Sequence, residues 1–221
     1  MMAKYGQFCA VARALEVLGE RWTLLIVREL LVGARTFTEI RRGLPRLPRA
    51  TLSARLRELS KAGLVESTQD GHELTPTGAA LAPVIRELAR WTTLEHGVPL
   101  DSDHLDTNAL TWDMQRRVDT DSLPTRTVVL AMDFVDRKPS DKYFWLHLSR
   151  SEVNLCREDT GAPVNIWIQA PTEPVTRWWL GELTWLQLRR RQDVSIHGDQ
   201  RLISQAQRWF MRYLFTPDSL M

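Results

Sequence analysis

Apolar residues recur at helical spacing through the N-terminal part of the chain. Leu, Ile, Val and Trp return every three or four positions, which is the period of a helix with one buried face. The helices predicted in this way cover residues 10–18, 21–32, 37–42, 48–62 and 76–95. Gly19, Gly33 and Gly63 follow three of them, where glycine commonly ends a helix.

The predicted helix over residues 37–42 is short, and a break at Gly43-Leu44-Pro45 separates it from the next one. Thr36 and Glu39 have the spacing of a capping box, which fixes where the short helix begins. A hairpin is expected soon after the helix over residues 48–62, because Asp70-Gly71 is a turn signal between two short runs that favour strands. The order of elements is therefore helix, helix, short helix, break, helix and hairpin.

The pattern changes beyond a stretch of Pro, Gly, Asp, Ser and His at residues 97–106. A short helix is expected over residues 106–118, and from Val128 onward apolar residues alternate with more polar ones, as in half-buried strands. Helices are expected over residues 173–183, 184–191 and 200–214, with a short strand at 194–197. We therefore expect an α+β protein with two domains: a winged helix-turn-helix over residues 1–97, and an α+β domain with an antiparallel sheet over residues 98–221.

Charge is distributed unevenly along the 221 residues, although the formal net charge is only +2. Residues 35–61 hold eight Lys or Arg side chains against two Glu, so the remainder of the chain is slightly acidic. A local basic block of this kind indicates a polyanionic partner for that segment alone.

The helix over residues 48–62 is the expected recognition element for double-stranded DNA. Leu52, Leu56 and Leu59 share one face, and the opposite face carries Arg49, Ser53 and Arg57. Arg suits bidentate contacts to guanine in the major groove, and Ser can bond to several bases. Flanking basic side chains suit phosphate contacts, and these are Arg41, Arg42, Arg46 and Lys61.

The segment from Cys9 to Trp91 resembles the HxlR-type winged helix family of transcriptional regulators. The resemblance rests on "ALEVLGERWTLLIVRELLVGARTFTEIRRGLPRLPRATLSARLRELSKAGLV" followed by "HELTPTGAALAPVIRELARW". It implies a homodimer joined through the first and last helices, bound to a pseudo-palindromic operator. Two features depart from the family pattern: Gly19-Glu20-Arg21 stands where two glycines and a lysine are common, and the wing lacks basic and aromatic residues. The resemblance also places Cys9 where some relatives use a redox-sensing cysteine, whereas a buried apolar role is the alternative.

The C-terminal half is rich in tryptophan, and Trp145 and Trp167 fall on the strand face opposite Leu146 and Ile166. Apolar groups on both faces of a strand indicate either ordinary packing or a pocket for an apolar or aromatic small molecule. The residues expected to line such a pocket are Trp145, Trp167, Trp179 and Trp185. This half resembles, at low motif specificity, the sterol-carrier-protein-like fold, which implies an apolar ligand.

Enzymatic motifs are missing from the sequence, so we expect no catalytic residues, no cofactor and no metal site. The acidic residues around His104 are typical of a linker. With no apolar run long enough for a membrane span and no signal peptide, we expect a cytoplasmic location. Two alternatives remain open. The C-terminal domain oligomerises or recruits a protein, or the chain is a small-molecule carrier whose N-terminal module is an interaction element.

Overall fold

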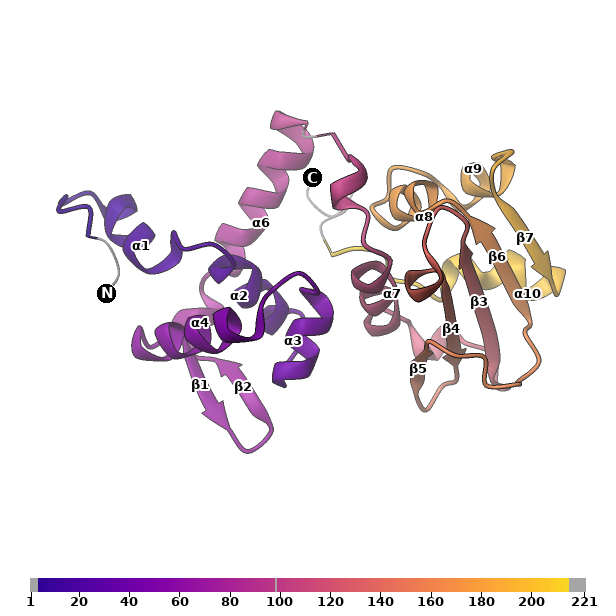
Figure 1. Ribbon diagram of the computed structural model, residues 1–221, viewed down its shortest axis with the longest axis horizontal. Coiled ribbons are helices and arrows are strands. Elements are labelled where there is room, and N and C mark those ends of the chain that lie inside the picture. The colour runs from indigo at the N-terminus through magenta and orange to yellow at the C-terminus, as the bar shows by residue number, and fades with distance from the viewer. Residues whose placement is uncertain (1–3, 98, 215–221) are drawn as a thin grey trace. The chain divides into compact units, whose positions relative to one another are not determined.

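The computed structural model describes residues 4–97 and 99–214 of the chain. It divides into two compact units, Met1–Ala89 and Arg90–Met221. The elements of both units are labelled in Figure 1, and each unit is described by itself.

The N-terminal unit consists of helices followed by a two-stranded hairpin, as the hydrophobic spacing predicts. Its elements are α1 (Ala10–Leu18), α2 (Thr23–Leu31), α3 (Phe37–Gly43), α4 (Arg49–Lys61), β1 (Val65–Thr68), β2 (Gly71–Leu74), α5 (Pro76–Ala79) and most of α6 (Ala82–Arg90). The core lies between α2, α3 and α4, and its fully buried side chains include Ile26, Leu30, Ile40, Leu52 and Leu59.

The single long helix expected over residues 76–95 is instead broken into three parts. Helix α5 ends at Ala79, α6 begins at Ala82, and a π-helical turn, η1 (Trp91–His96), follows α6. Pro83 explains the first interruption, because proline lacks the backbone N–H that would continue the α5 ladder and is tolerated in a first helical turn.

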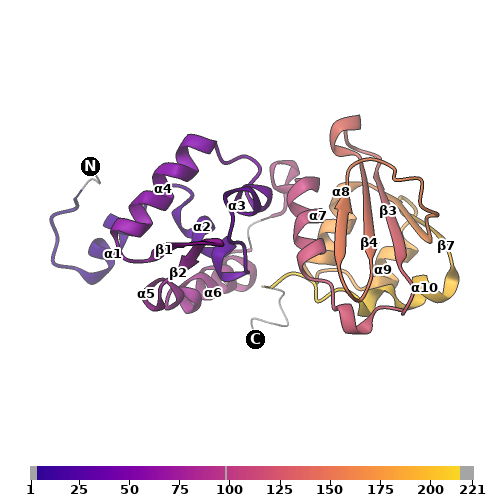
Figure 2. The same ribbon diagram turned by 90° about the horizontal axis from the view of Figure 1, so that it is seen from below.

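The C-terminal unit contains a five-stranded sheet with helices packed against one face. The elements are α7 (Thr107–Arg116), β3 (Val128–Phe134), β4 (Tyr143–Leu148), β5 (Val153–Cys156), β6 (Ile166–Ala170), α8 (Thr172–Trp179), α9 (Trp185–Arg190), β7 (Ser195–Gly198) and α10 (Gln200–Gln205). The strand order is β5-β4-β3-β6-β7. Helices α8, α9 and α10 lie on the same face of the sheet in both views (Figures 1 and 2).

The sheet differs from the antiparallel arrangement expected from the sequence at one pair of strands. Strands β3 and β6 run parallel, with Leu130 opposite Ile166, whereas the other neighbouring strands pair antiparallel. Strand β5 was not expected, because its four residues are too few to establish an alternating pattern. The α+β class is confirmed, and the sheet within it is mixed.

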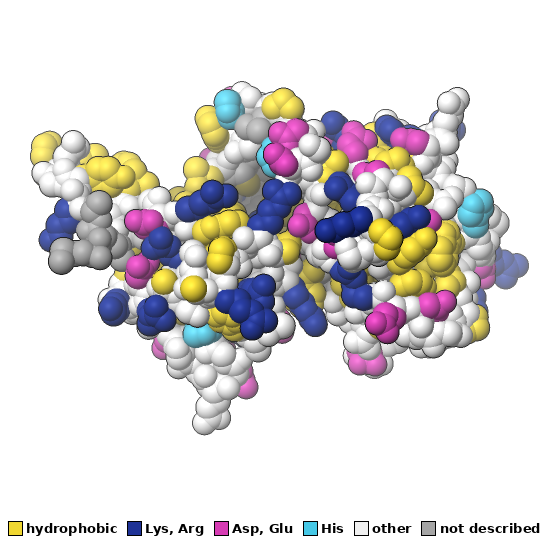
Figure 3. Space-filling model, viewed as in Figure 1, with side chains coloured by type: hydrophobic (Ala, Val, Ile, Leu, Met, Phe, Trp, Pro, Cys, Tyr) yellow, Lys and Arg dark blue, Asp and Glu magenta, His cyan; other side chains and the backbone are white. Residues whose placement is uncertain are grey.

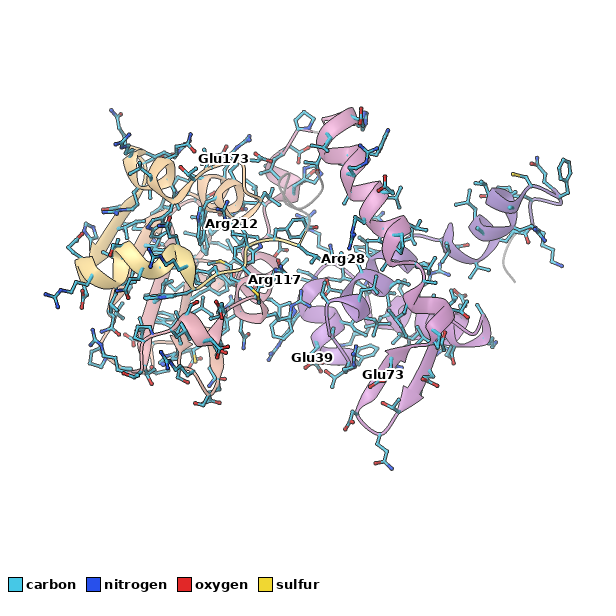
Figure 4. The ribbon with its side chains drawn as sticks, turned by 180° about the vertical axis from the view of Figure 1, so that it is seen from behind. Arg28, Glu39, Glu73, Arg117, Glu173 and Arg212 are labelled. Atoms are coloured by element: carbon cyan, nitrogen blue, oxygen red, sulfur yellow. The ribbon has the colours of Figure 1, made fainter. Side chains whose placement is uncertain are left out.

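The final helix is shorter than the 200–214 segment expected. Helix α10 ends at Gln205, and the chain then runs beside the segment that follows α7. The backbone N–H of Met211 donates to the Arg117 carbonyl at 2.9 Å, and the Arg117 side chain donates to the Arg212 carbonyl (Figure 4). These bonds between two distant segments of the chain replace the hydrogen bonds that a continued helix would make within itself.

Candidate nucleic-acid interface

Helix α3 begins at a complete capping box. The Thr36 hydroxyl accepts from the Glu39 backbone N–H at 3.2 Å, and the Glu39 carboxylate accepts from the backbone N–H groups of Thr36 and Arg35 at 2.9 Å each. Burial raises the pKa of Glu39, but the hydrogen bonds from Thr36 and Arg35 outweigh it and hold the pKa below the ordinary carboxyl value. The cap predicted from the sequence is confirmed, and it fixes the first helix of the helix-turn-helix.

Helix α4 has the two faces that its sequence predicts. Leu52, Leu56 and Leu59 are buried against the rest of the N-terminal unit. On the other side Arg49 and Arg57 are exposed, and Ser53 between them is half-buried. Within the described residues, neither Arg49 nor Arg57 makes an ion pair. Both guanidinium groups are therefore available to a partner outside the chain.

The flanking basic residues differ in exposure. Arg42, Arg46 and Lys61 are exposed, whereas Arg41 is half-buried with its Nε enclosed. Several Lys and Arg side chains gather over α3 and α4 in the space-filling view (Figure 3). The structure places the residues expected to touch phosphate around the same helix pair, and their contacts with DNA stay a prediction.

Two arginines of the basic block have structural roles that the charge count did not reveal. Arg55 donates to Glu20 at 2.7 Å and also to Glu58, so it joins the turn after α1 to α4. Arg35 donates to the Leu30 carbonyl at 3.1 Å and lies 3.6 Å from the Glu73 carboxylate. Glu20 occupies the position where the family commonly has a glycine, and its pairing with Arg55 gives that departure a structural role.

The hairpin of β1 and β2 is the wing, and its surface is acidic. Glu66 and Glu73 are directly opposite each other in the register, and Figure 4 shows Glu73 on the hairpin. Gly71, with φ of 131°, comes so near the Arg35 carbonyl that a Cβ would lie 2.4 Å from the oxygen. The wing is thus held against the segment before α3, but its carboxylates do not suit phosphate contacts.

Helices α1 and α6 carry apolar side chains that the N-terminal unit leaves uncovered. No residue of α1 is buried, and Val11 is 66% exposed. On α6, Ile85 is buried, whereas Leu88 is 47% exposed beside a surface hollow that it lines together with Pro83, Val84 and Glu87. Figure 1 shows α1 standing apart from α2, α3 and α4.

Cys9 is exposed at the start of α1 and is not in a buried, apolar position. The backbone N–H of Ala12, and then that of Val11, lowers the pKa of its thiol below the ordinary value. The buried role considered for Cys9 is therefore wrong, and the redox role, which is the alternative raised by the family resemblance, stays a hypothesis.

The four tryptophans expected to line one pocket lie on opposite faces of the C-terminal sheet. Trp179 and Trp185 belong to the main core beneath the helices. Trp145 belongs to a smaller cluster on the other face, and Trp167 packs against that cluster. The acidic stretch near His104 has capping roles: Asp101 caps a short turn, and Asp106 accepts from two backbone N–H groups at the start of α7.

Together, the capped α3, the two-faced α4 and the following hairpin define a winged-helix DNA-binding protein. Residues 17–97 match the family model described as HxlR-like helix-turn-helix. The uncharacterized HTH-type transcriptional regulator YvaP of Bacillus subtilis (strain 168) is 39% identical over 88 residues, which cover 37% of this chain and 82% of YvaP. The chain belongs to the HxlR family and is a transcriptional regulator with an HxlR-type DNA-binding domain.

Solved structures give further matches. The quinone-bound YodB from B. subtilis is 34% identical, covering 38% of this chain and 94% of YodB at a TM-score of 0.36. The UbiJ-SCP2 ubiquinone synthesis protein matches 60% of this chain and 95% of its own length, at 11% identity and a TM-score of 0.33. No helix within residues 4–97 and 99–214 has the length and apolarity needed to cross a membrane.

Proposed function

We propose that this chain is a cytoplasmic, homodimeric regulator that inserts α4 of each copy into the major groove of a pseudo-palindromic operator. The observation that carries the proposal is the exposed Arg49 and Arg57 on the face of α4 opposite the buried leucines. Both arginines contact base edges, with Ser53 between them. The residues that contact phosphates are Arg41, Arg42, Arg46 and Lys61.

The homodimer is supported by the uncovered apolar surfaces of the first and last helices of this domain. A helix such as α1, with apolar side chains but no buried residue, gains stability only when another surface covers it. One recognition helix also reads too few base pairs to find a site in a genome, so a two-fold pairing of half-sites is expected. A second copy that covers Val11 and Leu88 meets both requirements, within a DNA-binding and dimerisation domain over residues 1–97.

The test begins by selecting binding sequences from random double-stranded DNA with the purified full chain. Affinity for the selected site and for unrelated DNA is then measured for the wild type and for the Arg49→Ala/Arg57→Ala double variant. We expect the variant to lose preference for the selected site while circular dichroism stays unchanged. Selected sequences without two-fold symmetry, or equal affinity of both proteins for the selected site, would contradict the proposal.

The C-terminal domain, over residues 98–221, is proposed to bind an apolar small molecule that alters DNA affinity. Support comes from Trp145 and the second apolar cluster on the sheet face that no described helix covers. Coupling between such sites is typically about 1–3 kcal/mol and must be reciprocal. Operator DNA is therefore expected to change ligand affinity by the same factor as the ligand changes DNA affinity. If no small molecule changes DNA affinity, the domain only oligomerises or recruits a protein, which is the second candidate.

A further inference from the structure

The sheet of the C-terminal unit has an outer face, defined here as the face opposite helices α7 to α10. The strand register places five residues in one row across that face: Cys156 on β5, Trp145 on β4, Ala131 on β3, Trp167 on β6 and His197 on β7. Paired residues on neighbouring strands point to the same side of a sheet. The row therefore places one indole on each side of an alanine.

Ala131 is the smallest member of this row and lies on the central strand. Neighbouring strands are about 4.8 Å apart, so Trp145 and Trp167 arise from backbones separated by about 10 Å. The floor between them has only a methyl group, and yet Ala131 is 0% exposed and Trp145 is 7% exposed. Ala131 and Trp145 are therefore covered by neighbouring side chains and by a segment that lies over this face of the sheet.

The cover is the connection from β5 to β6, residues 157–165, which has no helix or strand. Strand β5 lies at one edge, and β6 lies on the far side of β3, so this connection has to pass two strands. It does so over the outer face, since Ala162 and Val164 pack against the Trp145 cluster. Thr160 lies 3.2 Å from the His147 ring, in hydrogen-bond contact. An irregular segment of this kind can move aside more readily than a packed helix.

The indole N–H of Trp145 is buried and has no acceptor among the described residues. The two expected pocket tryptophans on the helices are satisfied: Trp179 donates to the Asp113 carboxylate at 2.8 Å, and Trp185 donates to the Ile203 carbonyl at 3.1 Å. Buried donors are nearly always paired, because an unpaired one loses its bonds to water without replacement. Trp145 therefore presents an unused hydrogen bond inside an apolar enclosure.

We propose that the outer face binds a flat, neutral aromatic molecule between Trp145 and Trp167, with a carbonyl oxygen that accepts from the Trp145 indole. This inference rests on the small-molecule part of the proposed function and gives it a place and a chemistry. The ring stacks over Ala131, where the two indole faces supply contact area. The ligand is neutral because the row holds no Asp, Glu, Lys or Arg, and Asp133 on the same face already lies 3.4 Å from the Lys142 ammonium.

The experiment uses 9-fluorenone and fluorene, which share a flat ring system but differ in the carbonyl group. In a Cys9→Ser background, Cys156 is the sole thiol of the chain and lies next to Trp145 in the register. Binding is measured as protection of Cys156 from alkylation and as quenching of tryptophan emission. We expect fluorenone to bind about five- to tenfold more tightly than fluorene, as one neutral hydrogen bond allows.

The matched variants are Trp145→Phe and Trp167→Phe. The first removes the donor and keeps a ring, so it should bring the affinities for fluorenone and fluorene together. The second removes stacking area only, so it should weaken both probes and preserve their ratio. Ala131→Leu fills the floor and should abolish protection of Cys156 by both probes, with urea unfolding as the check on its fold.

The proposal is overturned if neither probe protects Cys156, or if Trp145→Phe leaves the ratio of affinities unchanged. Its failure is distinguishable from failure of the proposed function. If fluorenone binds as described but never alters operator affinity, the site stands and the regulatory role of the domain fails. If a small molecule alters operator affinity equally in the wild type, Trp145→Phe and Ala131→Leu, the regulatory role stands and this site is wrong.

Discussion

Replacing Arg46 with alanine should reduce the salt dependence of DNA binding. The size of the reduction should also show how many copies of the protein bind one operator. Arg46 is exposed in the turn between α3 and α4, and no acidic side chain among the described residues pairs with it. Each phosphate that the protein neutralises contributes about 0.9 to the slope of log affinity against log salt concentration. A dimer has one Arg46 at each half-site, so Arg46→Ala should flatten the slope by about 1.8.

The assay is fluorescence anisotropy with labelled operator between about 50 and 200 mM salt. Arg49→Lys is the matched comparison, because it keeps the charge but lacks the planar fork that makes two bonds to one guanine. It should leave the slope unchanged and lower the preference for the operator over unrelated DNA, by about 1–3 kcal/mol for each guanine that is no longer recognised. The two variants thus separate phosphate binding from base recognition on neighbouring residues.

Arg55→Ala controls for loss of structure, since Arg55 is held by Glu20 and Glu58. It should lower the free energy of unfolding in urea while leaving the salt slope near the wild-type value. An unchanged slope in Arg46→Ala would refute the phosphate role of this turn. A reduction of about 0.9 instead of 1.8 would refute the binding of two copies to one operator.

Further predictions concern the dimer, the α3 cap and the first cysteine. Val11→Asp and Leu88→Asp should each give a monomer by light scattering, because each places a charge on a surface that the second copy covers; a dimer in both variants would contradict that interface. The low pKa of Glu39 means that its stabilisation is complete above the ordinary carboxyl pKa and is lost as pH falls through the folded-state pKa. The free energies of unfolding in urea of the wild type and of Glu39→Gln should therefore converge as the pH falls from about 6 to about 3. A difference in free energy that stays constant over this range would argue against the cap. Iodoacetamide should alkylate Cys9 faster than Cys156 near neutral pH, because Cys9 is exposed and its thiol pKa is lowered; equal rates would exclude thiolate activation at α1.

Local spacing was enough to predict the helices of the N-terminal unit that precede the hairpin. Helix α1 has the predicted bounds, and the capping box at Thr36 is present as the sequence indicates. These features depend on residues three or four positions apart, whose relation is fixed by the helical period. The same reasoning identified Leu52, Leu56 and Leu59 as the buried face of α4.

Features that depend on distant residues were not accessible to the same reasoning. The parallel pairing of β3 with β6 joins Leu130 to Ile166, and nothing in either strand specifies its neighbour. The helical pattern of residues 76–95 continues through Pro83, so it did not show the break before α6. Strand alternation could place Trp145 and Trp167 on one face of the sheet. It could not place Trp179 and Trp185, because their position depends on how the helices pack on the sheet, and the four were therefore assigned to one pocket although they lie on opposite faces.

The central place of β3 has a consequence for how the chain is made. Its hairpin with β4 closes as soon as residue 148 has emerged from the ribosome, but its other edge waits for β6, which begins at Ile166. During that interval β3 presents unpaired backbone groups and apolar side chains, a combination that recruits strands from other chains. Premature termination of translation between β4 and β6 would therefore leave one edge of β3 permanently unpaired. Truncated products of this gene should then be degraded by proteases or should aggregate.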